Sequence, residues 1–69
     1  MDRMISVNGK NTDPDNYALT AVMAAEGIDP GARGIAVALN DSVIPRGRWA
    51  DTILSPGDRV EIVKVLQGG

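Results

Sequence analysis

The sequence of 69 residues contains no cysteine, no histidine and no phenylalanine, and only 3% of its residues are aromatic. Without cysteine and histidine it has no disulfide, no thiolate or imidazole for catalysis, and none of the usual ligands of zinc, iron–sulfur clusters or haem. With 43% hydrophobic residues, there is material for one domain with a small aliphatic core. Most of the common catalytic groups are therefore excluded.

The sequence also has no apolar run near the roughly 20 residues that span a bilayer, and no signal-type apolar stretch follows its start. Seven basic residues against nine acidic residues give a net charge of −2, which argues against nucleic acid as a partner. We expect a soluble cytoplasmic protein that binds no metal, membrane or nucleic acid.

The N-terminal segment predicts a hairpin. Residues 4–9 alternate apolar and polar side chains and end in Asn8-Gly9, a dipeptide that suits a tight turn with positive φ. Residues 10–13 form a short return strand with little apolar content, and Pro14 closes it because proline cannot donate a ladder hydrogen bond. The return strand is therefore expected at an edge.

A single helix is expected from Tyr17 to Glu26, where large apolar residues recur at a spacing of three and four and alanine is frequent. Asp15 or Asn16 is the expected N-cap, since either side chain can accept a hydrogen bond from a free amide of the first turn. Gly27 is expected to end the helix in the left-handed conformation.

Two further strands and a connection follow. Residues 34–40 alternate alanines with large aliphatics, which favours a central strand that is covered on both faces. Val43-Ile44 is a short apolar piece that Pro45 ends. The connection over residues 46–55 contains Trp49, which we expect at the core or its rim with its indole N–H donating to a carbonyl.

The last strand follows the turn Pro56-Gly57-Asp58 and covers residues 59–66. Its first face carries Val60, Ile62 and Leu66, and its second face carries Val63 and Val65. If the helix covers the first face, the second is a bare apolar strip, which is typical of a binding surface. The alternative is that the connection over residues 46–55 covers Val63 and Val65.

Gly68-Gly69 ends the sequence. Glycines are common at chain ends, where they need no function. Because glycine has no Cβ, two in a row can also enter a channel that is too narrow for a side chain. The ionised carboxylate of Gly69 is able to attack the α-phosphate of ATP, provided that a partner enzyme supplies ATP, Mg²⁺ and electrostatic stabilisation.

The sequence resembles the thiamin-pathway sulfur carrier family, ThiS, over residues 4–69. The most specific pieces are Ile35-Ala36-Val37-Ala38-Leu39-Asn40, Val43-Ile44-Pro45-Arg46 with Trp49, Gly57-Asp58-Arg59-Val60-Glu61-Ile62, and Val65-Leu66-Gln67-Gly68-Gly69. The resemblance implies an α+β, β-grasp (ubiquitin-like) fold with a mixed sheet of four to five strands packed on one helix. The sequence departs from the family at Ala18, where the family usually has a capping threonine, and at Glu26, where it has a large aliphatic.

The resemblance implies that the protein is a co-substrate and not an enzyme. An E1-like adenylyltransferase (ThiF type), which uses ATP and Mg²⁺, adenylates Gly69. Sulfur from cysteine, delivered by a cysteine desulfurase, converts Gly69 to a thiocarboxylate, and a thiazole synthase (ThiG type) takes up that sulfur. The expected partner-binding residues are Gln67, Gly68, Val63, Val65, Ile44 and Arg46. We expect one domain over residues 1–69, with residues 1–3 as a flexible extension and residues 67–69 as a mobile tail.

Three other interpretations remain open. The small subunit of molybdopterin synthase also ends in Gly-Gly, although that family tends to be longer and to have prolines before the glycines. A ubiquitin-like modifier would be joined through Gly69 to a lysine of a target protein. A β-grasp interaction module would carry the glycine tail without using it.

Overall fold

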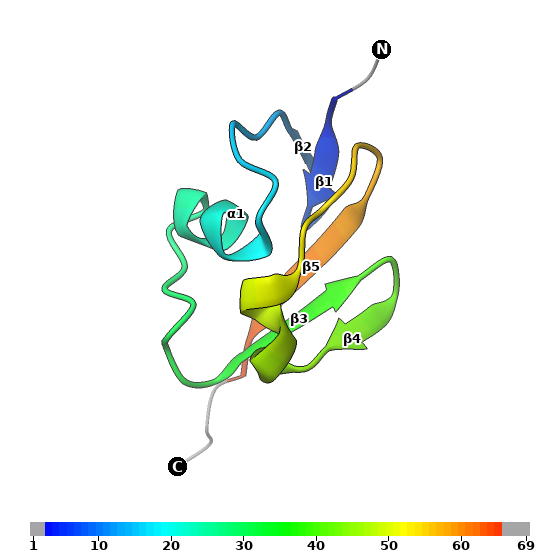
Figure 1. Cartoon of the computed structure of the whole chain (residues 1–69). Coiled ribbons are helices and arrows are strands. Elements are labelled where there is room, and N and C mark those ends of the chain that lie inside the picture. Colours follow the sequence, from blue (N-terminus) through cyan, green and yellow to red (C-terminus); the bar gives the residue numbers. More distant parts are fainter. Residues whose placement is uncertain (1–2, 66–69) are drawn as a thin grey trace.

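The computed structural model describes residues 3–65, which form a five-stranded mixed sheet with one α-helix (Figure 1). The elements in chain order are β1 (Ile5–Val7), β2 (Lys10–Thr12), α1 (Leu19–Ala25), β3 (Ile35–Leu39), β4 (Ser42–Ile44), the 3-10 helix η1 (Arg46–Asp51) and β5 (Arg59–Lys64). The strand order is β2-β1-β5-β3-β4. β1 runs parallel to β5, and the other neighbours are antiparallel. This is the predicted β-grasp architecture.

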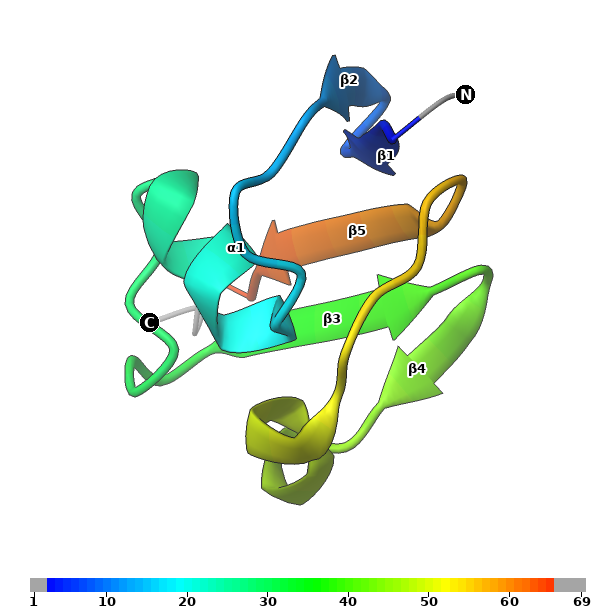
Figure 2. The same cartoon turned by 45° about the horizontal axis from the view of Figure 1, so that its top comes forward.

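The core lies between the sheet and the two helices. Figure 2 shows α1 lying across one face of the sheet, with η1 beyond the β4 side. The buried side chains are Ile5, Val7, Leu19, Val22, Met23, Val37, Trp49, Leu54, Val60 and Ile62. Among residues 3–65, no helix is both long and apolar enough to cross a membrane.

The hairpin β1–β2 forms as predicted. Asn8 and Gly9 both have positive φ, at 51° and 82°, which matches the twist that a two-residue hairpin turn requires. β2 pairs only with β1 and has one half-buried residue, so it is the expected edge strand.

The predicted N-cap of α1 is wrong. The helix begins at Leu19, and its N-cap is Ala18 in extended conformation with no side-chain hydrogen bond to the first turn. The amide of Leu19 donates to the carbonyl of Thr52, and the amide of Leu54 donates to that of Tyr17. These bonds hold the residues before the helix against the connection to β5 as an isolated bridge, so the helix starts later than its periodicity suggests.

The end of α1 agrees with the prediction. Gly27 has φ 79°, its amide donates to the carbonyl of Ala24, and the amide of Ile28 donates to that of Met23. This pair of bonds is the Schellman motif, in which a left-handed residue satisfies carbonyls of the last helical turn.

The middle of the sheet differs in part from the prediction. β3, expected to be central, is internal, but β5 occupies the middle position between β1 and β3. Trp49 is 4% exposed, and its indole N–H donates to the carbonyl of Ile44 at 2.9 Å, as predicted. η1 therefore packs on the α1 side of the sheet and leaves the other face of β5 without a helix.

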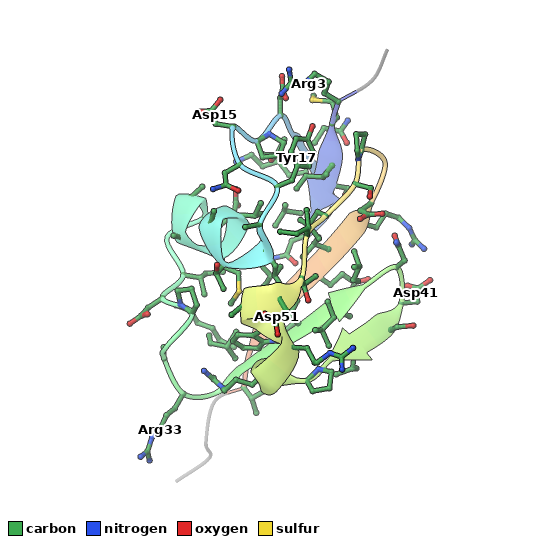
Figure 3. The ribbon with its side chains drawn as sticks, in the orientation of Figure 1. Arg3, Asp15, Tyr17, Arg33, Asp41 and Asp51 are labelled. Atoms are coloured by element: carbon green, nitrogen blue, oxygen red, sulfur yellow. The ribbon has the colours of Figure 1, made fainter. Side chains whose placement is uncertain are left out.

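Arg3 is the part of the expected N-terminal extension that lies within the described residues. Its carbonyl accepts a hydrogen bond from the hydroxyl of Tyr17, and its guanidinium lies 3.7 Å from Asp13. A side-chain interaction of the guanidinium with Tyr17, distinct from the bond to the carbonyl, and after it the charge of Asp13, raise the pKa of Arg3. Figure 3 shows Arg3 and Tyr17 near the start of β1.

Candidate functional site: the outer face of the sheet and the end of β5

Gly69, to which the sequence assigns the chemistry, and Gln67 and Gly68, which it assigns to partner binding, lie outside the described residues, as does the predicted mobility of that tail. What the structure describes is the strand that leads to them and the surface beside it. Both depend on β5, which ends at Lys64. Val65 follows it and is the last residue that the structure describes.

The second face of β5 is exposed. Val60 and Ile62 point into the core, whereas Val63 is 52% exposed and Val65 is 53% exposed. The alternative in which the connection over residues 46–55 covers these two valines is wrong, because that connection packs against α1 on the opposite face. The apolar strip predicted from the sequence is therefore present.

The strip continues across β3 to β4. Ala36 lies opposite Val63 in the β3–β5 ladder, and Ala38 lies opposite Val43 in the β3–β4 ladder. Val43 is 76% exposed, and the two small alanines form the floor of a shallow hollow between it and Val63. We define Ala36, Ala38, Val43 and Val63 as the outer-face patch.

Glu61 lies at the edge of the outer-face patch, opposite Ala38 in the ladder, and its side chain is exposed. The surface is thus apolar in its middle and has a carboxylate on one side. Val43 was not among the predicted partner-binding residues. The alternation within the short piece Val43-Ile44 could have revealed it, because only one of two consecutive strand residues faces the core.

Ile44 is the residue of that pair that faces the core. It lies opposite the buried Val37, is half-buried and packs against the core cluster. It therefore does not share a face with Val63 and Val65, with which the sequence grouped it.

Arg46 is likewise away from the outer-face patch, at the start of η1. Its guanidinium carbon lies 4.5 Å from the centroid of the Trp49 ring, and the group donates hydrogen bonds to the carbonyls of Pro30 and Ala32. The side chain that we expected to meet a partner is engaged within the protein. Arg33, in the same segment as the two carbonyls, points away from the body of the protein (Figure 3).

The end of β5 rests against Gly34. The amide of Val65 donates to the carbonyl of Gly34, which has φ 74°. A Cβ added at Gly34 would lie 2.8 Å from the carbonyl oxygen of Val65, too close for any side chain. From the sequence, Gly34 was expected only as the start of a strand. A glycine next to a strand can mark a close approach of two backbones, and that signal was available.

Asn8 holds the other side of β5. Its carboxamide oxygen accepts from the amide of Ile62 at 2.7 Å, and its carboxamide nitrogen donates to the carbonyl of Ile62 at 3.1 Å. β1 pairs with β5 only as far as Val60, so this side chain continues the ladder where the strand has ended. β5 is therefore held as far as Ile62 on the β1 side and as far as Lys64 on the β3 side, where the bond between Val65 and Gly34 follows.

Three comparisons with known proteins agree. The sequence model of the ThiS family matches residues 3–69. The sulfur carrier protein ThiS of Escherichia coli (strain K12) is 36% identical over 44 residues, which are 64% of this chain and 67% of that protein. The crystal structure of the thiamine biosynthesis protein ThiS from Geobacter metallireducens is similar with a TM-score of 0.77 and 29% identity, covering 96% of this chain and 99% of that one.

Proposed function

The chain belongs to the ThiS family, and on that basis we propose that it is a sulfur carrier protein of thiamin biosynthesis. The observation that carries the proposal is the family match, which runs through residues 3–69 and so includes the terminal Gly68-Gly69. The fold supports it, because the related structure from Geobacter metallireducens has the same architecture over nearly its whole length.

In the proposed reaction an oxygen of the Gly69 carboxylate attacks the α-phosphate of ATP, and pyrophosphate leaves. The carboxylate is the ionised form at neutral pH, and the resulting acyl-adenylate is a good acyl donor. Sulfur that a cysteine desulfurase draws from cysteine as a persulfide then attacks the acyl carbon and displaces AMP, and a thiol reduces the resulting acyl disulfide to a C-terminal thiocarboxylate. A thiazole synthase takes up this sulfur.

The protein itself acts as a co-substrate in this scheme. An E1-like adenylyltransferase would supply the ATP site, Mg²⁺ and the groups that stabilise the charge developing on the phosphate. The part that this chain contributes is recognition, and the outer-face patch with Val65 is the surface that we propose for it. A contiguous exposed apolar surface next to the reactive end favours docking of a partner there.

The proposal is tested by the intact mass of the purified protein after incubation with Mg²⁺, ATP, an E1-like activating enzyme and a cysteine-derived sulfur source. We expect a gain that equals the exchange of one oxygen for sulfur, located at Gly69. A variant that lacks Gly69 is the control and gains nothing. An unchanged mass with an enzyme that modifies another carrier contradicts the proposal.

Further measurements separate the remaining interpretations. A ubiquitin-like modifier gives a stable isopeptide adduct between Gly69 and a lysine of another protein. A sulfur carrier that serves molybdopterin synthesis gives the same thiocarboxylate but passes its sulfur to a molybdopterin precursor. An interaction module binds its partner equally well without Gly69.

A further inference from the structure

The segment between α1 and β3 is a loop that Arg46 holds from outside. Within the loop, the amide of Gly31 donates to the Asp29 carboxylate at 2.8 Å, and the amide of Ala32 donates to the Asp29 carbonyl at 3.0 Å. These bonds close a turn but do not attach it to the rest of the protein. Arg46 makes that attachment through the carbonyls of Pro30 and Ala32.

The guanidinium of Arg46 is well suited to this task. Its planar fork presents two N–H groups side by side, and here they reach two carbonyls of one turn. Its carbon lies over the ring of Trp49, whose own position is fixed by burial and by the hydrogen bond to Ile44. The side chain is therefore held in place by a rigid support before it meets the loop.

The loop leads directly to the end of β5. Gly34 follows Ala32 by two residues, and its carbonyl accepts the hydrogen bond of the Val65 amide. The space between the two backbones is so small that a Cβ at Gly34 would not fit. A displacement of the loop that reaches Gly34 therefore displaces Val65 or breaks the hydrogen bond between them.

We propose that Arg46 is a positioning residue for the C-terminal tail. It acts through the turn at Pro30 and Ala32 and through Gly34, and it sets the direction in which the chain leaves β5, instead of pairing with an acidic group of a partner. The inference rests on the proposed function, because the tail direction has a consequence only if Gly69 is delivered to an activating enzyme.

The first test needs no partner. Amide hydrogen exchange is measured in the free protein for Arg46→Ala and for the control Arg48→Ala, whose guanidinium has no hydrogen bond or ion pair with any residue from 3 to 65. We expect the amides of Ala32 and Val65 to exchange about tenfold faster in Arg46→Ala, while the amide of Val37 stays protected, because local opening exposes only the amides that it releases. Arg48→Ala leaves all three unchanged.

The second test uses the activating enzyme. We expect Arg46→Ala to keep the Kd of the complex within about twofold and to lower the single-turnover rate of adenylation about tenfold, since a misplacement of about 1 Å costs up to ~100-fold in rate. Arg46→Lys retains the charge but not the planar fork, so we expect its adenylation rate to lie between those of the unmodified protein and Arg46→Ala. If Arg46→Ala only destabilises the protein, the Tm falls, but the adenylation rate is unchanged at a temperature where all variants are folded.

The outcomes are distinguishable. If Arg46→Ala weakens the Kd and leaves the exchange of Val65 unchanged, Arg46 is a partner contact and the inference is overturned. Unchanged exchange with unchanged rate overturns it as well. If the unmodified protein itself is not adenylated, the proposed function fails, and the exchange result still decides whether Arg46 holds the end of β5.

Discussion

Gly34→Ala is the change that acts most directly on the end of β5. Gly34 has φ 74°, where an L residue with a Cβ costs about 1–2 kcal/mol, and the new Cβ would lie 2.8 Å from the carbonyl oxygen of Val65. Gly27→Ala is a matched control in the same loop. Gly27 has φ 79°, and its Cβ would meet nothing within 4 Å. The two variants share the backbone strain and differ in the close contact.

The cost of the close contact has an upper bound. Val65 is the first residue after β5, so the chain can relieve the clash by giving up the hydrogen bond between Val65 and Gly34. The net contribution of such a bond is about 1 kcal/mol. We therefore expect Gly34→Ala to lose about 1 kcal/mol more free energy of unfolding than Gly27→Ala.

This difference is large enough to measure in a protein of 69 residues. A loss of 1 kcal/mol lowers the Tm of so small a domain by about 4–8 °C. Thermal unfolding followed by circular dichroism gives the two Tm values, and amide exchange of Val65 reports the local release. Only Gly34→Ala should abolish the protection of Val65, and only it should slow the adenylation of Gly69.

Equal Tm values for the two variants, together with retained protection of Val65 in Gly34→Ala, would refute the reasoning. The end of β5 would then accommodate a Cβ by a shift that leaves the hydrogen bond intact. Equal adenylation rates with lost protection would show that the direction of the chain at Val65 does not limit the reaction.

Three other changes test other parts of the structure. Val63→Asp should leave the Tm within a few degrees and weaken the Kd for the activating enzyme at least about tenfold, which is about 1.4 kcal/mol; a large loss of Tm or an unchanged Kd contradicts this. Asn8→Asp should lower the free energy of unfolding, measured in urea, by about 1–3 kcal/mol, because a carboxylate oxygen would face the Ile62 carbonyl. Unchanged stability would contradict the role of this side chain in extending the ladder. Ala18→Ser should raise the free energy of unfolding by about 1 kcal/mol by capping the first turn. Ala24→Ser, at an exposed position within the helix, should lower it by about 0.5 kcal/mol. The opposite order would place the helix start elsewhere.

The elements of this fold are predictable because their signals are local. Asn8-Gly9 and Gly27 adopt positive φ for reasons contained in the residues themselves, and the alternation in β5 determines which of its side chains face the core. The N-cap was predicted wrongly because a non-local contact decides it. The bridge between Ala18 and Ile53 holds the chain extended beyond Asn16, although that residue is a good cap.

The candidate site was predictable only where one strand forms it. The exposure of Val63 and Val65 follows from the period of β5. Alternation also indicates that one of Val43 and Ile44 faces outward, but the register that places Val43 beside Ala38 in the β3–β4 ladder does not show in the sequence. Arg46 was predicted to bind a partner, and nothing in the sequence indicates its contacts within the protein. Its two acceptors are backbone carbonyls 14 and 16 residues earlier, and backbone acceptors leave no mark in a sequence.

The position of the outer-face patch relative to the end of β5 bears on how binding becomes reaction. Val63 lies on β5 and Val65 directly follows it, so under the proposed function docking at these two residues would remove much of the translational and rotational freedom of the C-terminal end relative to the partner. Gly69 follows Val65 by four residues, a span of at most about 14 Å when fully extended. In the proposed reaction, a partner that docks on the patch would hold the α-phosphate of ATP within that distance of Val65.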